Sequence, residues 1–158
     1  MRQQIAQPLS RLVVLAALLL PGSSCSSGPP PPALDVGFRE LAQILDATIK
    51  DAQIEVTRTE DLRSPECTTN IGWTNTGKYK QSRHVEGALP SPADLRAQVQ
   101  KIGARWQSEK FTVRFFETRD GGMISVTAQD DRRGDLFFSG FTNRNQVSLS
   151  AETICLKP

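Results

Sequence analysis

Four short runs in the last third of the chain alternate apolar and polar residues, which is the pattern of half-buried β-strands. Polar turns separate the runs, and glycine in the first turn, Asp120-Gly121-Gly122, supplies the positive φ that a tight hairpin needs. Consecutive strands joined by short turns pair antiparallel, so the pattern predicts a four-strand meander. The predicted strands are residues 110–118, 123–129, 136–142 and 146–155.

Two segments carry apolar residues at spacings of three and four, the period of an amphipathic helix. The first is residues 35–52, with Asp35 as the predicted N-cap. The second is residues 91–102, which opens on Ser91 as a cap and is predicted to stop at Gly103.

Between the two helices the pattern is weaker. Residues 53–58 and 78–85 are candidates for two further strands, and residues 61–77, which include Trp73, are predicted to be mostly loop. The order helix, two strands, helix, four strands predicts an α+β fold, in which two amphipathic helices pack on an antiparallel sheet with a C-terminal meander.

The N-terminal segment differs in composition from the rest of the chain. Residues 12–20 are apolar without interruption, two arginines precede them, and a Pro-Gly-Ser-Ser sequence follows. Such a run is too short to span a bilayer, which takes about 20 residues. Residues 1–24 are therefore predicted to be a signal peptide rather than a core helix. Residues 34–158 are predicted to form a single α+β domain.

Cys25 directly follows this segment, and two outcomes of export are open. Acylation would make Cys25 a lipidated N-terminus; the segment resembles the lipobox of bacterial lipoproteins, although Gly22 stands where that motif prefers leucine. Ordinary cleavage would instead release a soluble secreted protein. Cysteine parity favours acylation, because an exported chain with three cysteines otherwise leaves one thiol unpaired. Residues 25–33, with four consecutive prolines, are then a lipid anchor and a semi-rigid tether.

The charge balance argues against nucleic acid as a partner. The chain has 19 basic and 17 acidic side chains, and residues 1–24 hold two arginines and no acid, so the remainder has 17 of each. Nucleic-acid binding draws most of its affinity from the neutralisation of phosphates, and a domain with no net charge and no basic cluster does not supply it.

The remaining cysteines are Cys67, in the predicted loop, and Cys155, at the end of the last strand. In an oxidising compartment they are predicted to form one disulfide. Closing so long a loop is worth about 4–5 kcal/mol in the chain-entropy model. The pair lacks Cys-x-x-Cys spacing, which favours a structural role over a redox role.

Candidate catalytic and metal-binding residues are few. His84 is the only histidine and lies in a polar segment, so no catalytic residue is assigned. One histidine and two paired cysteines do not make a usual zinc site, and the aspartates of residues 130–135 lack calcium-loop spacing. No metal and no other cofactor is predicted. The tripeptide Arg133-Gly134-Asp135, which integrins bind, arises easily by chance in a turn.

Aromatic residues provide the candidate binding surface. With strict alternation, three phenylalanines of the meander lie on the sheet face opposite to Phe115 and Phe138. One set lines the core beneath the helices, and the other is exposed for binding or covered by a loop. The candidate patch consists of Phe116, Phe137 and Phe141, with Trp73 on the covering loop.

The apolar segment ending in Ser23-Ser24-Cys25, the proline tether and the cysteine pair together resemble the small lipoproteins of mycobacteria and related actinobacteria. The resemblance covers most of the chain in layout. It implies a place on the outer face of the cell membrane, held by an N-terminal lipid, and it supplies no catalytic residues.

Three functions of different classes follow from this reading. The first, which we expect, is a non-catalytic, membrane-tethered binding module whose partner belongs to the cell envelope. The second is a carrier of a lipid or another apolar small molecule held between the helices and the sheet. The third is a hydrolase, which would need His84.

Overall fold

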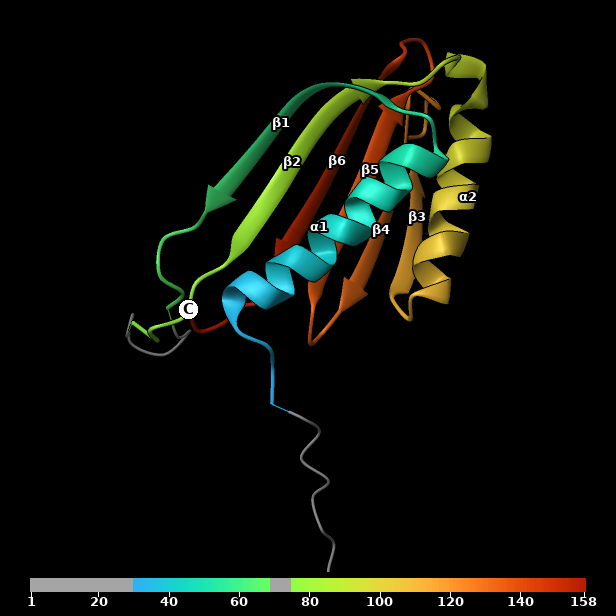
Figure 1. The fold of residues 1–158 in the computed structure, drawn as a ribbon. Helices are drawn as coiled ribbons and strands as arrows, with labels where there is room; N and C mark the ends of the chain where they lie inside the picture. Colours follow the sequence, from blue (N-terminus) through green and yellow to red (C-terminus); the bar gives the residue numbers. More distant parts are fainter. Residues whose placement is uncertain (1–29, 69–74) are drawn as a thin grey trace, which may run out of the picture. The chain divides into compact units, whose positions relative to one another are not determined.

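The computed structural model describes residues 30–68 and 75–158. Within them, Pro31–Pro158 is one compact unit in which two helices cover one face of a six-stranded antiparallel sheet (Figure 1). The predicted α+β class, the order of the elements and the C-terminal meander are confirmed. The elements are α1 (Leu34–Asp51), β1 (Glu55–Arg63), β2 (Gln81–Ala88), a 3-10 turn (Pro92–Asp94), α2 (Leu95–Ser108), β3 (Thr112–Glu117), β4 (Met123–Asp130), β5 (Gly134–Phe141) and β6 (Gln146–Thr153).

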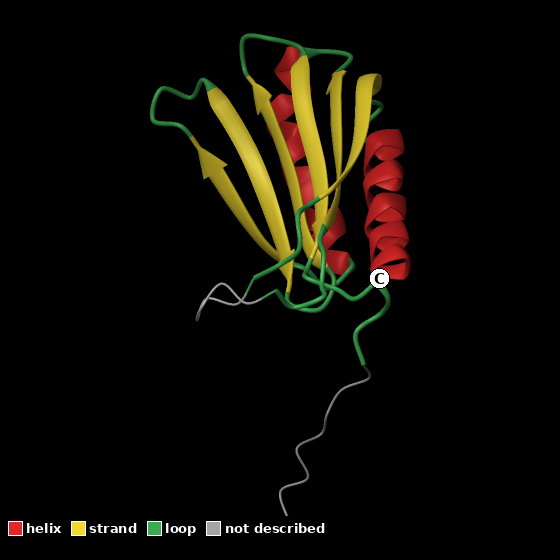
Figure 2. Ribbon diagram, turned by 90° about the vertical axis from the view of Figure 1, so that its left-hand side faces the viewer, coloured by secondary structure: helices red, strands yellow, loops and turns green. Residues whose placement is uncertain are grey.

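The strand order in the sheet is β1-β2-β6-β5-β4-β3. The last of these strands, β6, therefore lies in the interior of the sheet, and β1 and β3 form its two edges (Figure 1). Figure 2 shows the same sheet from the side. The register aligns four apolar residues across the four inner strands, all on the face beneath the helices. They are Val85, Leu149, Phe138 and Val126, and each is at most 1% exposed.

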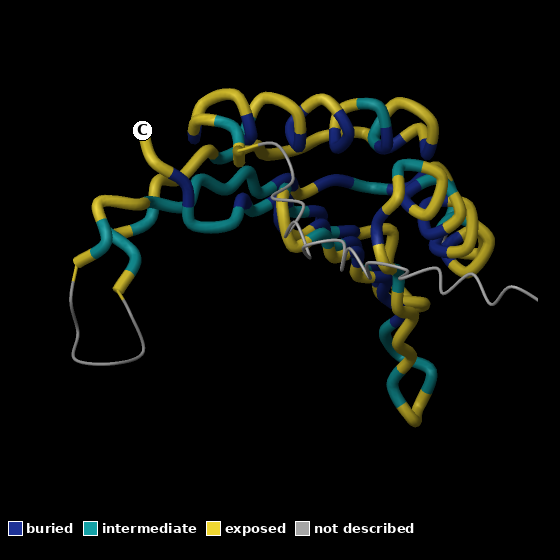
Figure 3. Tube along the Cα trace, turned by 90° about the horizontal axis from the view of Figure 1, so that it is seen from below, coloured by how far each residue is buried: buried dark blue, intermediate teal, exposed yellow. Residues whose placement is uncertain are grey.

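The core lies between this face and the two helices. α1 packs mainly on β6 and α2 mainly on β4, and the buried positions of both helices turn inward while their outer surfaces stay exposed (Figure 3). Trp106 of α2 is fully buried, and its indole N–H donates to the Thr48 hydroxyl of α1 at 3.0 Å. The polar end of the largest core side chain is thus satisfied by the neighbouring helix.

The start of α1 differs from the prediction. The helix begins at Leu34, and Ala33 is its N-cap residue, so Asp35 lies in the first turn and does not cap the helix. The backbone N–H of Leu34 instead donates to the carbonyl oxygen of Lys157 at 2.8 Å, which ties the start of α1 to the C-terminal segment.

The predicted end of α2 was also wrong, because the helix runs through Gly103 to Ser108. Gly103 is buried against β3, where an added Cβ would come within 2.4 Å of the ring of Phe115. The glycine therefore permits a close helix–strand approach rather than a helix end.

The first two strands are displaced from their predicted positions. β1 reaches Arg63, beyond the predicted 53–58, so the first residues of the predicted loop 61–77 are strand. β2 begins later than predicted, at Gln81. The alternation of β1 is weak because almost all of its residues are exposed on both faces of an edge strand.

Candidate functional site: the open face of the sheet

The sheet face turned away from the helices is called the open face below. Alternate residues of each strand contribute to it, because successive side chains of a strand point to opposite faces. The open face includes Arg114, Phe116, Ser125, Thr127, Phe137, Ser139, Phe141, Ser148, Ser150, His84 and Glu86. Both helices lie on the other side of the sheet (Figures 1 and 2).

The three phenylalanines of the candidate patch share the open face but do not form one cluster. Phe116 is 58% exposed, Phe141 is 42% exposed, and Phe137 is half-buried. Phe137 and Phe141 are four residues apart on β5, which corresponds to about 13 Å along the strand. Phe116 lies two strands from them, at about 10 Å across the sheet. Their spacing suits several anchor points on one surface rather than a single pocket.

Phe115 and Phe138 lie on the helix-facing side. Phe138 is fully buried, whereas Phe115 is 45% exposed. The difference arises because Phe138 is on an inner strand and Phe115 is on the edge strand β3, where α2 covers it from one side only. β3 therefore exposes aromatic side chains on both faces of the sheet.

Two of the predicted site residues, Cys25 and Trp73, lie outside the described residues. The same holds for the predicted signal peptide and for most of the predicted tether.

Two shallow hollows indent the open face. The Phe141 hollow has a volume of about 260 Å³ and is lined by Thr57, Glu86, Gly87, Ser139, Phe141, Gln146, Val147 and Ser148. The Phe137 hollow has a volume of about 320 Å³ and is lined by Arg114, Thr127, Ala128, Gln129, Asp135, Leu136 and Phe137. Each hollow thus combines one aromatic wall with hydroxyl, amide and charged groups. Sequence patterning did not predict the hollows, because they depend on register and on the bulge between Val56 and Arg58 in β1.

His84 lies on the inner strand β2. Its Nε2 is 3.7 Å from the nearer carboxylate oxygen of Glu86, and Ser150 stands directly opposite it on β6. Among the described residues, no hydrogen bond joins His84 to a serine hydroxyl. Nor do three or more His, Cys, Asp or Glu side chains in the described ranges gather into a possible metal site.

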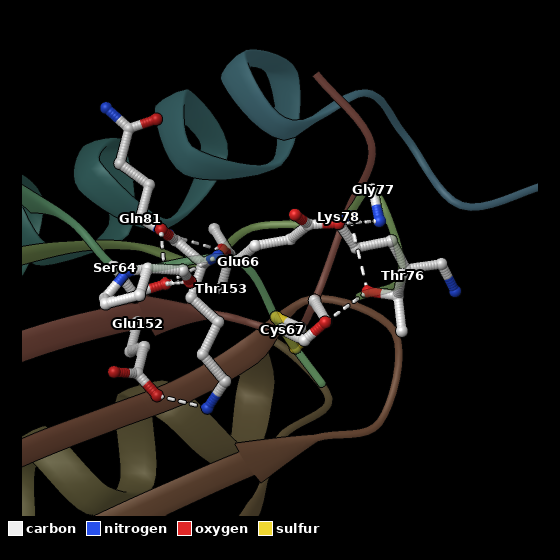
Figure 4. The surroundings of a disulfide bond; sticks show 12 residues. Ser64, Glu66, Cys67, Thr76, Gly77, Lys78, Gln81, Glu152 and Thr153 are labelled. Carbon is white, nitrogen blue, oxygen red and sulfur yellow. Dashed lines mark hydrogen bonds and ion pairs between the residues drawn. A yellow bond between two sulfur atoms is a disulfide. The ribbon is translucent and has the colours of Figure 1, made fainter. Parts of the chain in front are cut away.

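The predicted disulfide between Cys67 and Cys155 is confirmed. The two Cα atoms are 6.2 Å apart, and the residues are separated by 88 positions in sequence. The Thr76 hydroxyl donates to the carbonyl oxygen of Cys67 at 2.6 Å (Figure 4). Beside it, Tyr79 and Leu156 exchange backbone hydrogen bonds of 2.8 and 2.9 Å. The segment after β6 is thereby fixed to the loop between β1 and β2.

Arg133 holds a structural position that the sequence did not indicate. Its side chain is 17% exposed, stacks over Phe111 at 4.0 Å and donates to the carbonyl oxygen of Glu109 at 2.5 Å and to the Asp130 carboxylate at 2.9 Å. Burial raises the pKa of Asp130, but hydrogen bonds from Arg132 and Arg133 outweigh it and leave that pKa below its usual value. The arginine of the Arg-Gly-Asp tripeptide is therefore engaged inside the protein.

The comparisons with known proteins show a shared fold, but they assign the chain to no family. No family model matches the chain, and no curated protein gives a significant match. The crystal structure of a DUF4853 family protein from Actinomyces odontolyticus ATCC 17982 is similar, with a TM-score of 0.53 and 16% identity, over 79% of this chain and 68% of that one. At this identity the likeness establishes the shared fold alone, in a protein from an actinobacterium. No helix in the described part of the chain is long and apolar enough to cross a membrane.

Proposed function

We propose that the protein is an exported, lipid-anchored cell-envelope protein, and that its domain is a non-catalytic binding module with the open face as its binding surface. The supporting observation is the exposure of Phe116 and Phe141 on a sheet face that neither helix covers. Exposed aromatic side chains bury large areas on association and act as interface anchors.

The chemistry of the open face suits a protein partner. Serine and threonine side chains separate the phenylalanines, and the charges nearby are of both signs, as with Arg114 and Glu86. Aromatic anchors among neutral hydrogen-bonding groups are typical of protein–protein interfaces. The two hollows are open depressions that accept partner side chains, whereas small-molecule sites usually bury most of their ligand.

The carrier function receives less support. The space between helices and sheet is filled by buried side chains, among them Trp106 and Phe138. The hollow between α1 and α2, beside Thr48 and Ile102, has a volume of about 40 Å³. Pockets that bury a small ligand measure roughly 300–1,000 Å³. We therefore favour surface binding over internal transport.

The location is tested by the intact, non-reduced mass of the protein extracted from membranes of an actinobacterial host. A chain that begins at Cys25, carries an acyl mass and is two hydrogens short of the reduced form is the expected result. An unacylated chain in the culture medium would contradict the anchor and leave a secreted binding protein.

The binding surface is tested by replacing Phe137 and Phe141 with serine in one variant, and Phe116 with serine in another. We expect partners captured by cross-linking on intact cells to fall about tenfold or more in the double variant, the effect of losing an interface anchor. Thermal unfolding should show that the fold is kept. The matched control is Val36→Ser, at an exposed position on α1, which should capture partners like the wild type. Equal capture by all variants would contradict the proposal.

A further inference from the structure

The edge strand β3 presents unpaired backbone groups together with aromatic side chains. The N–H of Thr118, just beyond β3, donates to the carbonyl oxygen of Met123 at 3.0 Å, in register with the β3–β4 ladder. Backbone groups alternate in direction along an antiparallel strand. Val113, Phe115 and Glu117 therefore direct their N–H and C=O groups away from β4, and no other element in the described ranges bonds to them.

This outward edge is complementary to itself. An antiparallel copy placed about a two-fold axis at Phe115 pairs Phe115 with Phe115 of the second copy, and Val113 with Glu117 of the second copy. Pairs of this kind exchange two hydrogen bonds each, which gives about six across the junction. On the open face the same register sets Arg114 opposite Phe116 of the second copy, within reach of a cation–π contact.

Neighbouring registers are poorer. An axis at Arg114 sets two arginines directly opposite each other, and like charges in that position are destabilising. An axis at Phe116 leaves the outward groups of Val113 without a partner in β3. Only the register about Phe115 pairs all three outward residues of β3 with one another.

The helix beside β3 does not oppose such pairing. On the side of α2 that faces β3, Arg96 binds Glu117 at 2.6 Å and Gly103 contacts Phe115. Helical spacing adds Gln100 and Gln107 to this side. Arg96 is the single charged residue on this side of α2, and it is paired with Glu117. Two α2 helices that approach each other across the axis therefore carry no uncompensated like charges.

We propose that the protein forms a homodimer in which two β3 strands pair antiparallel about Phe115 and join the two sheets into one. The open faces of the two copies then make one continuous surface. The other edge, β1, does not offer this junction, because five of its nine residues are charged and a bulge interrupts it. The inference is independent of the proposed function.

The test measures the molar mass of the full chain in mild detergent by light scattering, at up to about 100 μM, where a dimer with a micromolar dissociation constant is populated. The wild type should be a dimer. Phe116→Arg places an arginine opposite Arg114 and should weaken the dimer about tenfold or more. Phe116→Glu places a carboxylate there and should keep it, and Arg114→Glu should rescue Phe116→Arg. The matched control on the β1 edge is Leu62→Arg, which should dimerise like the wild type.

A monomeric wild type would overturn the proposal. So would equal dimerisation of all variants, because the association would then use another surface. Loss of the dimer with both Phe116→Arg and Phe116→Glu would rule out the register and the proposal with it. Circular dichroism shows whether each variant is folded.

If Phe116→Arg does not fold, cross-linking of Phe115→Cys tests the proposal instead. Its two thiols would meet on the axis, with Cα atoms about 5.5 Å apart, and form a dimer that a reductant separates. Thr59→Cys on β1 is the control, and absence of a Phe115→Cys dimer counts against the proposal.

Discussion

The two edges of the sheet are built in opposite ways. β1 is rich in charge and bulged, and its Asp61 is bonded to Arg83 of the neighbouring strand at 2.7 and 2.9 Å. β3 is regular and exposes two adjacent phenylalanines, Phe115 and Phe116. Charges and bulges at an edge prevent pairing with other chains. The protein thus protects one edge and leaves the other able to pair.

The supports behind the two edges also differ. The disulfide fastens the loop that follows β1 to the end of the chain, whereas β3 is held by its neighbour β4 and by packing against α2. The β1 side therefore depends on a covalent bond, and the β3 side depends on side-chain packing. Three measurements separate these contributions.

The largest expected effect comes from removing the disulfide with Cys67→Ala and Cys155→Ala together. The free energy of unfolding in urea should fall by about 4–5 kcal/mol, because the unfolded chain regains the entropy of a long loop. Amide hydrogen exchange should accelerate more in β1 and β2 than in β3 and β4. A loss of unfolding free energy below about 1 kcal/mol, or equal acceleration of amide exchange on the β1 and β3 sides, would show that the β1 side does not depend on the disulfide more than the β3 side does.

A pair of glycine substitutions should have unequal effects. A Cβ at Gly87 would come within 2.7 Å of the backbone oxygen of Glu55 in β1, so Gly87→Ala should cost about 1–3 kcal/mol of unfolding free energy. Gly103→Ala meets the end of the Phe115 ring, which can turn outward at the exposed edge, and a methyl group of Val113 at 3.4 Å. The helix gains up to about 1 kcal/mol in propensity. We expect Gly103→Ala to stay within about 1 kcal/mol of the wild type. If Gly103→Ala lost more unfolding free energy in urea than Gly87→Ala, the β3 side would be the more rigid of the two.

The smallest expected effect concerns the two ion pairs. The hydrogen bond from Arg83 lowers the pKa of Asp61, and that from Arg96 lowers the pKa of Glu117. A carboxyl whose pKa is lowered by folding stabilises the protein above its ordinary pKa and loses that contribution as the pH falls through the lowered value. Asp61→Asn should cost less than about 1 kcal/mol at neutral pH, because the carboxylate of the pair is exposed to solvent. At the lowest pH, where Asp61 is protonated, the substitution should cost nothing.

Glu117→Gln should have an even smaller effect than Asp61→Asn, since Arg96 is far more exposed than Arg83. NMR titration should place both carboxyl midpoints below the ordinary values of 3.8 and 4.5. A larger loss of stability from Glu117→Gln than from Asp61→Asn would mean that the ion pair at β3 stabilises the fold more than the ion pair at β1.

The sequence predicted the parts of the fold in which one face of an element is buried and the other is polar. This holds for β4, β5 and β6, whose alternation is strong, and for the interior of both helices. β1 gave a weak signal because an edge strand exposed on both faces needs no apolar face. The end of α2 was misjudged because Gly103 serves a tertiary contact with Phe115, which local sequence does not encode.

The candidate site was predictable only in part. Alternation assigned Phe116, Phe137 and Phe141 to one face, because the side-chain period of a strand is fixed. Their separation and the two hollows depend on strand order and register, which are long-range properties. The contacts of Arg133 with Glu109 and Phe111, in the segment between α2 and β3, were equally beyond local patterning.

The position of β6 affects how the polypeptide matures. Among the described strands, the last in sequence lies between β2 and β5, so the sheet hydrogen bonds that join the β1–β2 hairpin to the other strands all run through β6. A chain truncated before Gln146 would lack Leu149 and Ala151 from its core and would expose two additional strand edges. Chains that lack β6 should therefore be efficient targets for proteases and chaperones, and the complete sheet forms only when β6 is present.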